Sequence, residues 1–219
     1  MSQQLDLQEQ EQLDALKAFW KQYGNALTWI LIAVLGAYAA WNGWNYYQRR
    51  QAEQAAAMYD ELDRASAAAE ADKANRVFAD LRERFPKAAF TAQGGLLAAK
   101  VLAEKGQLEP ARAAFAWVAD NATDEDVRAL ARLRWSGLLL DEKKYDEALK
   151  VLEGIKSTSM EALSADRRGD ILMLQGKKSE AVASYRAAWQ SLPESLDYRR
   201  LVEAKLTALG AAPDAGAVK

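Results

Sequence analysis

The stretch GDILMLQGKKSEAVASYRAAWQSLP, residues 169–193, decides the fold. Its small, turn-forming, aromatic and proline positions are Gly169, Gly176, Ala181, Tyr185, Ala188 and Pro193. Between them the apolar residues recur every three or four positions, which predicts two helices joined at Gly176. An alanine such as Ala181 fits where two antiparallel helices approach most closely, because a larger side chain would push them apart. The stretch therefore predicts a helical hairpin.

The same pattern occurs three more times upstream. Aligned on small residues, four units are pinned at Ala74, Ala111, Ala148 and Ala181, at spacings of 37, 37 and 33 residues. These spacings are close to the ~34 residues of a tetratricopeptide repeat, a pair of antiparallel helices. One hairpin cannot bury its apolar face alone, so successive units stack around a shared core. The repeats indicate an α-helical solenoid.

The first three units keep fewer of the motif positions than the fourth. They retain Phe78, Leu81 and Pro86 in the first unit, Gly106, Phe115 and Val118 in the second, and Tyr145, Asp146, Glu147, Leu152 and Ile155 in the third. A turn glycine supplies the positive φ that ends the first helix of a unit. The apolar residues that follow each pinned alanine, including Leu152 and Ile155, are expected on the buried stripe of the second helix. We expect residues 196–209 to cap the stack and Gly210 to end that helix.

An uncharged stretch precedes the repeats. No charged residue lies between Lys21 and Arg49, and residues 25–46 reach the length of about 20 residues that crosses a hydrocarbon core. Aromatic residues lie at both ends, as is typical of membrane interfaces. They are Trp20 and Tyr23 at one end and Trp41, Trp44, Tyr46 and Tyr47 at the other.

A cleaved signal peptide and a buried core helix are the alternatives for this stretch. A signal peptide begins with basic residues and soon becomes apolar, whereas four acidic residues come first here and no small-residue cleavage site follows. We therefore expect an uncleaved anchor. Lys17 and Lys21 on one side are balanced by Arg49 and Arg50 on the other, so charge does not set the orientation.

The sequence thus predicts an all-α protein with a single N-terminal transmembrane helix and a tetratricopeptide-like helical-repeat solenoid. We expect a short polar tail over residues 1–22 and the transmembrane anchor over residues 23–47. The repeat domain, about four hairpins plus a capping helix, would cover residues 48–209. The last residues, 210–219, have no apolar period and are expected to be disordered.

Composition argues against most kinds of chemistry. The chain has no cysteine and no histidine, which excludes cysteine nucleophiles, Ser-His-Asp triads, disulfides and the usual zinc ligands. A formal charge of -2 makes nucleic acid an unfavourable partner. The acidic pairs Asp124 with Asp126 and Asp141 with Glu142 lie where helices join, a place in which carboxylates cap helices. We expect no enzyme activity, no cofactor and no metal.

A binding surface is the remaining function. In this architecture the first helix of each unit lines a concave groove. The residues expected to face inward are Tyr59, Asp63, Lys100, Leu133, Arg134, Asp170 and Met173. Tyrosine, leucine and methionine beside charges of both signs suit extended or helical polypeptide segments. Contact with a neighbouring helix or with water is the alternative for each of them.

The chain resembles a known family. The run LDALKAFWKQYGNALTWI, an anchor ending WNGWNYYQ and a degenerate repeat domain are similar to the YfgM family of ancillary subunits of the bacterial SecYEG translocon. The matching positions are Lys17, Phe19, Trp20, Gly24, Trp41, Trp44 and Tyr47. The resemblance implies a single-pass inner-membrane protein with a periplasmic C-terminal domain. It also implies association with SecYEG and with the membrane-anchored periplasmic chaperone PpiD, and the passing of translocated polypeptide clients to chaperones.

Two other functions stay open at this point. One is a scaffold for another envelope complex, such as those of cell-wall or cytochrome biogenesis, because anchored repeat proteins serve there too. The other is an enzyme, which would require a deep pocket with convergent ionisable groups. No catalytic residue can be carried over from the family, since no catalytic motif defines it.

Overall fold

The computed structural model describes residues 7–213, with side chains from residue 10 onward, and every regular element among them is a helix. This confirms the all-α fold class. The elements are α1 (Leu7–Ala67), α2 (Ala71–Arg84), α3 (Ala89–Glu104), α4 (Leu108–Asn121), α5 (Glu125–Asp141), α6 (Tyr145–Glu153), the 3₁₀ turn η1 (Thr158–Met160), α7 (Glu161–Leu174), α8 (Lys178–Ser191) and α9 (Asp197–Ala208).

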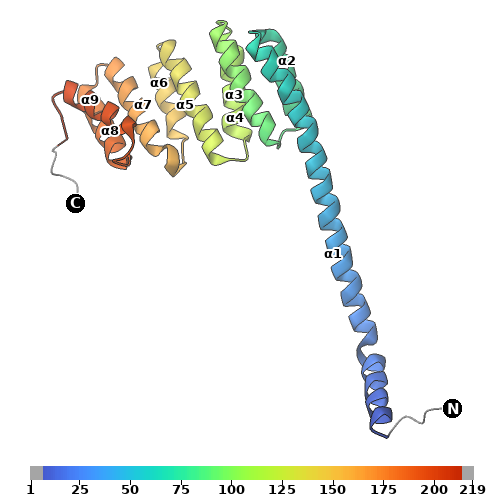
Figure 1. Cartoon of the computed structure of the whole chain (residues 1–219). Coiled ribbons are helices and arrows are strands. Elements are labelled where there is room, and N and C mark those ends of the chain that lie inside the picture. The colour runs from blue at the N-terminus through green and yellow to red at the C-terminus, as the bar shows by residue number, and fades with distance from the viewer. Residues whose placement is uncertain (1–6, 214–219) are drawn as a thin grey trace. The chain divides into compact units, whose positions relative to one another are not determined.

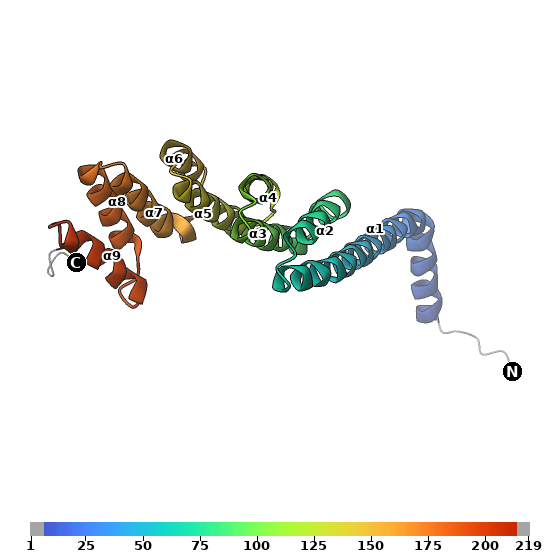
Figure 2. The ribbon, with the colours of Figure 1, turned by 90° about the horizontal axis from the view of Figure 1, so that it is seen from above.

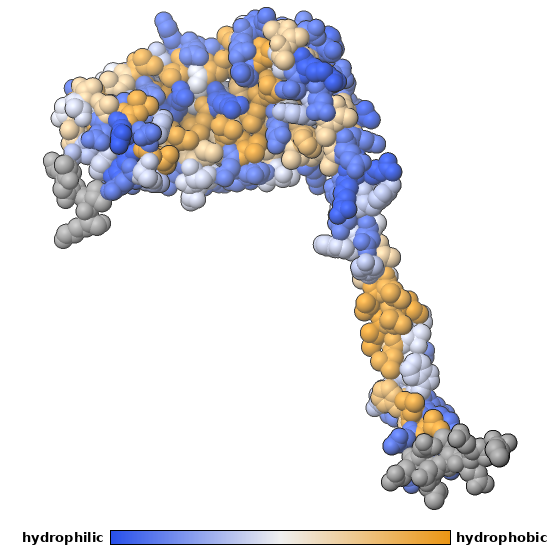
Figure 3. Space-filling view, viewed as in Figure 1, coloured by the Kyte–Doolittle hydropathy of each residue, from blue (hydrophilic) through white to orange (hydrophobic). Residues whose placement is uncertain are grey.

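The chain divides into two compact units, residues 1–50 and residues 51–219. The first unit carries the apolar part of α1, where Trp29, Ile30, Val34 and Leu35 are each more than half exposed. Apolar side chains form a continuous band along this part of the helix (Figure 3). This exposure contradicts the alternative of a buried core helix. Within the described residues, one helix is long and apolar enough to cross a membrane.

Helix α1 continues without interruption through the expected boundaries of the anchor. It already includes residue 7, so the part of the polar tail that the structure describes is helical. Residues 1–6 lie outside the described residues, and so do residues 214–219 of the expected disordered tail. Gly210 has a φ of 71° and follows the last helix directly after Leu209, as expected of a helix-ending glycine.

Four helical hairpins and a capping helix make up the second unit (Figure 1). Helix α3 pairs with α4, α5 with α6, and α7 with α8, and α9 packs on α8. In the first hairpin, Lys73 of α2 pairs with Glu61 of α1 at 4.0 Å, and the Arg84 guanidinium of α2 donates to the Met58 sulfur of α1 at 3.8 Å. Ala74, Ala111, Ala148 and Ala181 are each the fourth residue of a second helix, and each is 0% exposed. The predicted repeat register is therefore confirmed.

The two helices of successive hairpins form two rows. Seen from above, α2, α4 and α6 lie along one side, and α3, α5 and α7 lie along the other (Figure 2). The aromatic residues after the pins, Phe78, Phe115 and Tyr185, are buried between the rows. The first helices thus share one face of the stack, which is the face that the candidate site uses.

Each hairpin turns at a residue in the left-handed conformation. The four residues are Ala69, Gly106, Lys143 and Gly176, with φ of 55°, 73°, 59° and 76°, and each stands five positions before its pinned alanine. The two glycines confirm the predicted turns. The first and third units hold the same conformation without glycine, at a steric cost.

Close packing explains two glycines within the helices, Gly95 and Gly169. A Cβ on Gly95 would lie 2.4 Å from Val118 Cγ2 and 2.8 Å from Phe78 Cε2. A Cβ on Gly169 would lie 2.4 Å from Tyr185 Cε1. These contacts leave no room for a side chain, because real Cβ atoms do not approach other heavy atoms so closely.

The third unit departs from the expected pattern at its end. Its second helix, α6, has 9 residues, whereas α2, α4 and α8 have 14. Leu152 is buried as expected, but Ile155 lies beyond the helix and is only partly buried. Ile155 still packs on the same core as Leu152, but it does so from the segment after α6, because the helix ends at Glu153 and the chain passes through η1 into α7.

Candidate protein-binding groove

A groove of about 660 Å³ runs along the face of the first helices. Its lining comes from α3, α5 and α7, with one residue each from α4 and α9. The residues are Lys100, Ala103, Glu104, Phe115, Leu130, Leu133, Arg134, Gly137, Leu138, Asp141, Leu163, Asp166, Arg167 and Tyr198. This volume lies within the ~300–1,000 Å³ typical of ligand sites.

The floor of the groove is apolar. Leu133, Leu138 and Phe115 are nearly buried, so they belong to the core as well as to the groove. Leu130 and Leu163 are partly exposed beside them. Figure 3 shows apolar side chains gathered across the middle of this face, around α3 and α5, with hydrophilic side chains on both sides. An aliphatic side chain placed here would lose contact with water, which favours binding.

One end of the groove is held by a buried ion pair. Asp166 is 3% exposed and accepts hydrogen bonds from Lys205 Nζ at 2.7 and 2.9 Å and from Tyr198 Oη at 2.6 Å. Lys205 also donates to Asp170 at 2.7 Å, and Tyr185 Oη donates to the same carboxylate at 2.8 Å. A buried carboxylate is stable only when it is paired in this way. The pair fixes α9, and with it Tyr198, against α7.

This network also raises the pKa values of two tyrosines, Tyr185 and Tyr198. Burial raises the pKa of the Tyr185 phenol well above its usual range, and its hydrogen bond to Asp170 adds to the increase. Burial raises the pKa of Tyr198 in the same way, and the hydrogen bond to Asp166 adds to it. Both phenols therefore stay protonated donors at any physiological pH.

The predicted groove residues fall in two sets. Lys100, Leu133 and Arg134 line the groove. The other four lie elsewhere: Tyr59 packs its ring on Phe90 with centroids 5.7 Å apart, Asp63 is exposed on α1, Asp170 belongs to the Lys205 network, and Met173 packs on the C-terminal core.

Three further lining residues, Leu130, Leu163 and Arg167, were not predicted, although the repeat alignment points to them. Arg167 stands fourteen positions before its pinned alanine, as the predicted Arg134 does, and Leu130 and Leu163 both stand eighteen positions before theirs. Equivalent positions in stacked repeats share a face. Tyr198 had no such signal, because it lies outside the four units.

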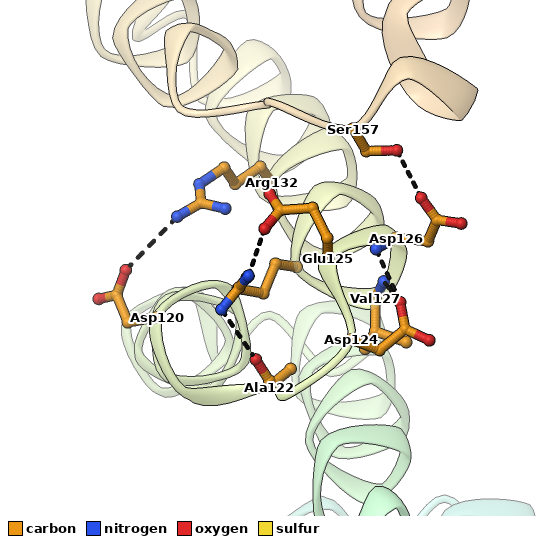
Figure 4. Close-up of polar contacts among 9 residues, drawn as sticks. Asp120, Ala122, Asp124, Glu125, Asp126, Val127, Arg132 and Ser157 are labelled. Carbon is orange, nitrogen blue, oxygen red and sulfur yellow. Dashed lines mark hydrogen bonds and ion pairs between the residues drawn. The ribbon is translucent and has the colours of Figure 1, made fainter.

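Three of the four carboxylates at the helix joins have structural partners in the described residues, namely Asp124, Asp126 and Glu142. Asp124 accepts hydrogen bonds from the backbone N–H groups of Asp126 and Val127 at the start of α5, and Asp126 accepts one from the Ser157 hydroxyl (Figure 4). Hydrogen bonds from Ser157 and Ser159 lower the pKa of Asp126. Glu142 pairs with Lys144 at 2.8 Å and with Arg112 at 3.5 Å. Asp141 alone of the four lines the groove.

A second, polar hollow of about 280 Å³ lies near the start of α5. Arg132 reaches Asp120 at 3.7 Å across it (Figure 4). Arg128 pairs with Glu125 and donates to the Ala122 carbonyl at 3.2 Å. Its cations and carboxylates largely engage one another. The hollow is therefore explained by interactions within the chain.

The aromatic residues expected at the membrane interfaces all lie on α1 and are largely exposed. They are Trp20, Tyr23, Trp41, Trp44 and Tyr47. Some form pairs along the helix: the rings of Phe19 and Tyr23 are 5.1 Å apart, and those of Trp44 and Tyr47 are 6.3 Å apart. Such clusters of amphipathic rings suit the headgroup region of a bilayer.

Comparison with known proteins agrees with the fold. The profile of a family described as a tetratricopeptide repeat-like domain matches residues 17–211. A Neisseria gonorrhoeae protein named ancillary SecYEG translocon subunit is 30% identical over 204 residues, which cover 93% of this chain and 98% of that protein. Proteins with the same name from Escherichia coli and Haemophilus influenzae are 30% and 29% identical, cover 84% of this chain in each case, and are themselves covered over 86% and 90%.

The match to the repeat family covers nearly the whole of the described chain, and the Neisseria relative aligns across both the apolar helix and the repeats. The resemblance seen in the aromatic residues of the anchor is thereby confirmed. The chain belongs to the YfgM family, the family of the proteins named ancillary SecYEG translocon subunits.

Proposed function

We propose that this protein is a single-pass inner-membrane subunit that associates with the SecYEG translocon and binds polypeptide segments in the groove of its repeat domain. The observation that carries the proposal is the apolar groove on α3, α5 and α7 in a protein whose relatives bear the name of a translocon subunit. Tetratricopeptide-like solenoids use such continuous faces for recognition.

In this proposal α1 crosses the membrane and the repeat domain lies in the periplasm. Trp20 and Tyr23 would then mark the cytoplasmic interface, and Trp41, Trp44 and Tyr47 the periplasmic one. Protease added to intact spheroplasts should degrade residues 51–219 and spare the N-terminal end. Protection of the repeat domain in intact spheroplasts, with degradation only after lysis, would contradict this orientation.

The tether explains how a shallow groove could suffice. A domain held beside the exit of the translocon meets emerging chains at a high effective concentration, so weak affinity gives useful occupancy. The groove would keep an emerging segment from aggregating and pass it to periplasmic chaperones, of which the membrane-anchored PpiD is the proposed partner. Transfer requires that binding be weak enough to reverse.

Crosslinking from the anchor tests the translocon part of the proposal. A photoreactive residue at Leu35, on the apolar part of α1, should yield adducts with SecYEG subunits in native membranes. The same residue at Arg186, exposed on α8, serves as the control for contacts of the repeat domain. Adducts from Leu35 to a cell-wall or cytochrome biogenesis complex, in place of SecYEG, would favour the scaffold function instead.

The groove itself offers no sign of catalysis to pursue. Its buried carboxylate, Asp166, is paired with Lys205, and Tyr198 is held as a neutral donor. These groups fix α9 in place, which is a structural task. We therefore propose a binding protein and no enzyme activity.

A further inference from the structure

Two arginines in the groove have no carboxylate partner among residues 10–213. Arg134 projects from α5 and Arg167 from α7, and both line the cavity. The ion pairs that involve arginine in this part of the chain use other residues. A guanidinium is always charged and its donors match a carboxylate in pairs. These two side chains are therefore free to bind an acidic group from outside.

Two of the three carboxylates that line the groove are engaged by other residues and do not pair with Arg134 or Arg167. Glu104 lies 3.8 Å from Lys100, and Asp166 is held by Lys205 and Tyr198. Asp141 is the remaining acidic residue of the lining, and no ion pair with it is formed in the described residues. Lys205 serves both Asp166 and Asp170, so the basic and acidic residues of the groove and this network balance. Among residues 10–213, Arg134 and Arg167 stay outside these ion pairs, and they are the positive groups that the groove offers to a ligand.

The two guanidinium groups border one stretch of the groove. Arg167 crosses from α7 to α5, where its Nη1 lies 3.6 Å from the position that a Cβ on Gly137 would take. Gly137 and Arg134 are three residues apart on α5 and so share a face of that helix. Arg167 therefore lies over α5, on the helix face that also carries Arg134.

Aliphatic side chains alternate with these charges. Leu130 and Leu133 on α5 and Leu163 on α7 line the same cavity. Since Arg134 and Arg167 occupy equivalent positions of successive repeats, they offer hydrogen-bond donors from two neighbouring first helices. Two side-chain carboxylates of an internal segment can accept from both, one at each guanidinium.

We propose that the groove prefers internal polypeptide segments in which acidic and bulky aliphatic side chains are mixed. Two side-chain carboxylates bind Arg134 and Arg167, and the aliphatic side chains pack on Leu130, Leu133 and Leu163. This inference rests on the proposed function, because it specifies which segments the groove takes. Charge complementarity of this kind sets which partner binds more than how tightly it binds.

Labelled peptides of one length test the preference on the full chain in lipid nanodiscs. They are N-acetylated and C-amidated and combine leucine with glutamate, glutamine or lysine. We expect the glutamate peptide to bind roughly tenfold more tightly than the glutamine peptide by fluorescence anisotropy. The difference should shrink at high salt. Arg134→Gln with Arg167→Gln should remove it, while Arg186→Gln, a change at an exposed arginine outside the groove, should keep it.

Each other outcome overturns a defined part of the account. Equal binding of the glutamate and glutamine peptides, or tighter binding of the lysine peptide, contradicts the charge preference and leaves polypeptide binding intact. Binding that requires a free C-terminal carboxylate contradicts the choice of an internal segment. If no peptide binds to the unaltered chain, both this inference and the proposed function of the groove fail.

Discussion

Lys205 of α9 donates two hydrogen bonds to the buried Asp166 of α7, at 2.7 and 2.9 Å, across 39 positions of sequence. This pair joins the capping helix to the last repeat and places Tyr198 at the end of the groove. It is the place where the stability of the solenoid and the shape of its candidate site depend on the same contact.

Removal of Lys205 should therefore destabilise the protein. Lys205→Met leaves Asp166 buried without its cation, and breaking such a pair costs about 3 kcal/mol. The free energy of unfolding in urea measures the effect. Lys178→Met, at an exposed lysine of α8, is the control and should change stability by less than about 0.5 kcal/mol. Equal stabilities of the two variants would mean that the pair contributes little.

Alkaline pH should loosen the same region. Below about pH 10 the folded and unfolded chains both keep the protons of Tyr185 and Tyr198. Above it the unfolded chain loses these protons first, because both pKa values are raised in the folded state. Stability from this source is thus full below pH 10 and is lost as pH rises further. Melting temperatures from pH 8 to 11 should fall less steeply for Tyr185→Phe than for the unaltered chain, and parallel curves would contradict this.

Glycine at the two turns that lack it should stabilise the protein. Ala69→Gly and Lys143→Gly relieve a left-handed conformation that costs an L side chain about 1–2 kcal/mol, less the entropy that glycine adds to the unfolded chain. We expect each to raise stability by about 0.5–1 kcal/mol. Gly106→Ala and Gly176→Ala, at the equivalent turns, should lower it by about 1 kcal/mol. A thermal melt of the four variants checks the signs, and a loss on Ala69→Gly would contradict the assignment.

The effect of replacing a helical glycine with alanine should depend on the space around that glycine. Gly137→Ala adds a Cβ at an ordinary 3.6 Å contact and removes a poor helix former, so it should stabilise α5 by about 0.5–1 kcal/mol. Gly95→Ala and Gly169→Ala force a Cβ into Val118 and Tyr185, so each should cost about 1–3 kcal/mol. Chemical denaturation of the three variants would test this, and a uniform gain across them would show that the packing is looser than described.

The fold was predictable from the sequence because its determinants are local and repeated. The pinned alanines, the turns at Gly106 and Gly176 and the close packing of Gly169 each leave a residue type that can be read directly. The turns at Ala69 and Lys143 were not visible, since no glycine marks them. Backbone hydrogen bonds from Glu70 to the Ala65 carbonyl and from Lys144 to the Leu139 carbonyl accompany the left-handed conformation there. The early end of α6 was not visible either, because no proline marks it.

The site was less predictable, because its side chains meet across repeats. The register placed Lys100, Leu133 and Arg134 on the face that forms the groove. Asp170 lies at an equivalent face, but Lys205, 35 positions later, draws it into the capping contact. Tyr198 enters the lining by way of the same contact. Such pairings depend on how α9 docks, and a single sequence carries no spacing that reports it.

The central claim is that the groove on α3, α5 and α7 holds polypeptides as they leave the translocon. Photocrosslinking in membranes that carry a translocation-arrested secretory chain tests it most directly, with the photoreactive residue at Leu133 in the groove or at Arg186 on α8. The account predicts adducts with the arrested chain from Leu133 and few from Arg186. Adducts of equal yield from both positions, or none from Leu133, would contradict it.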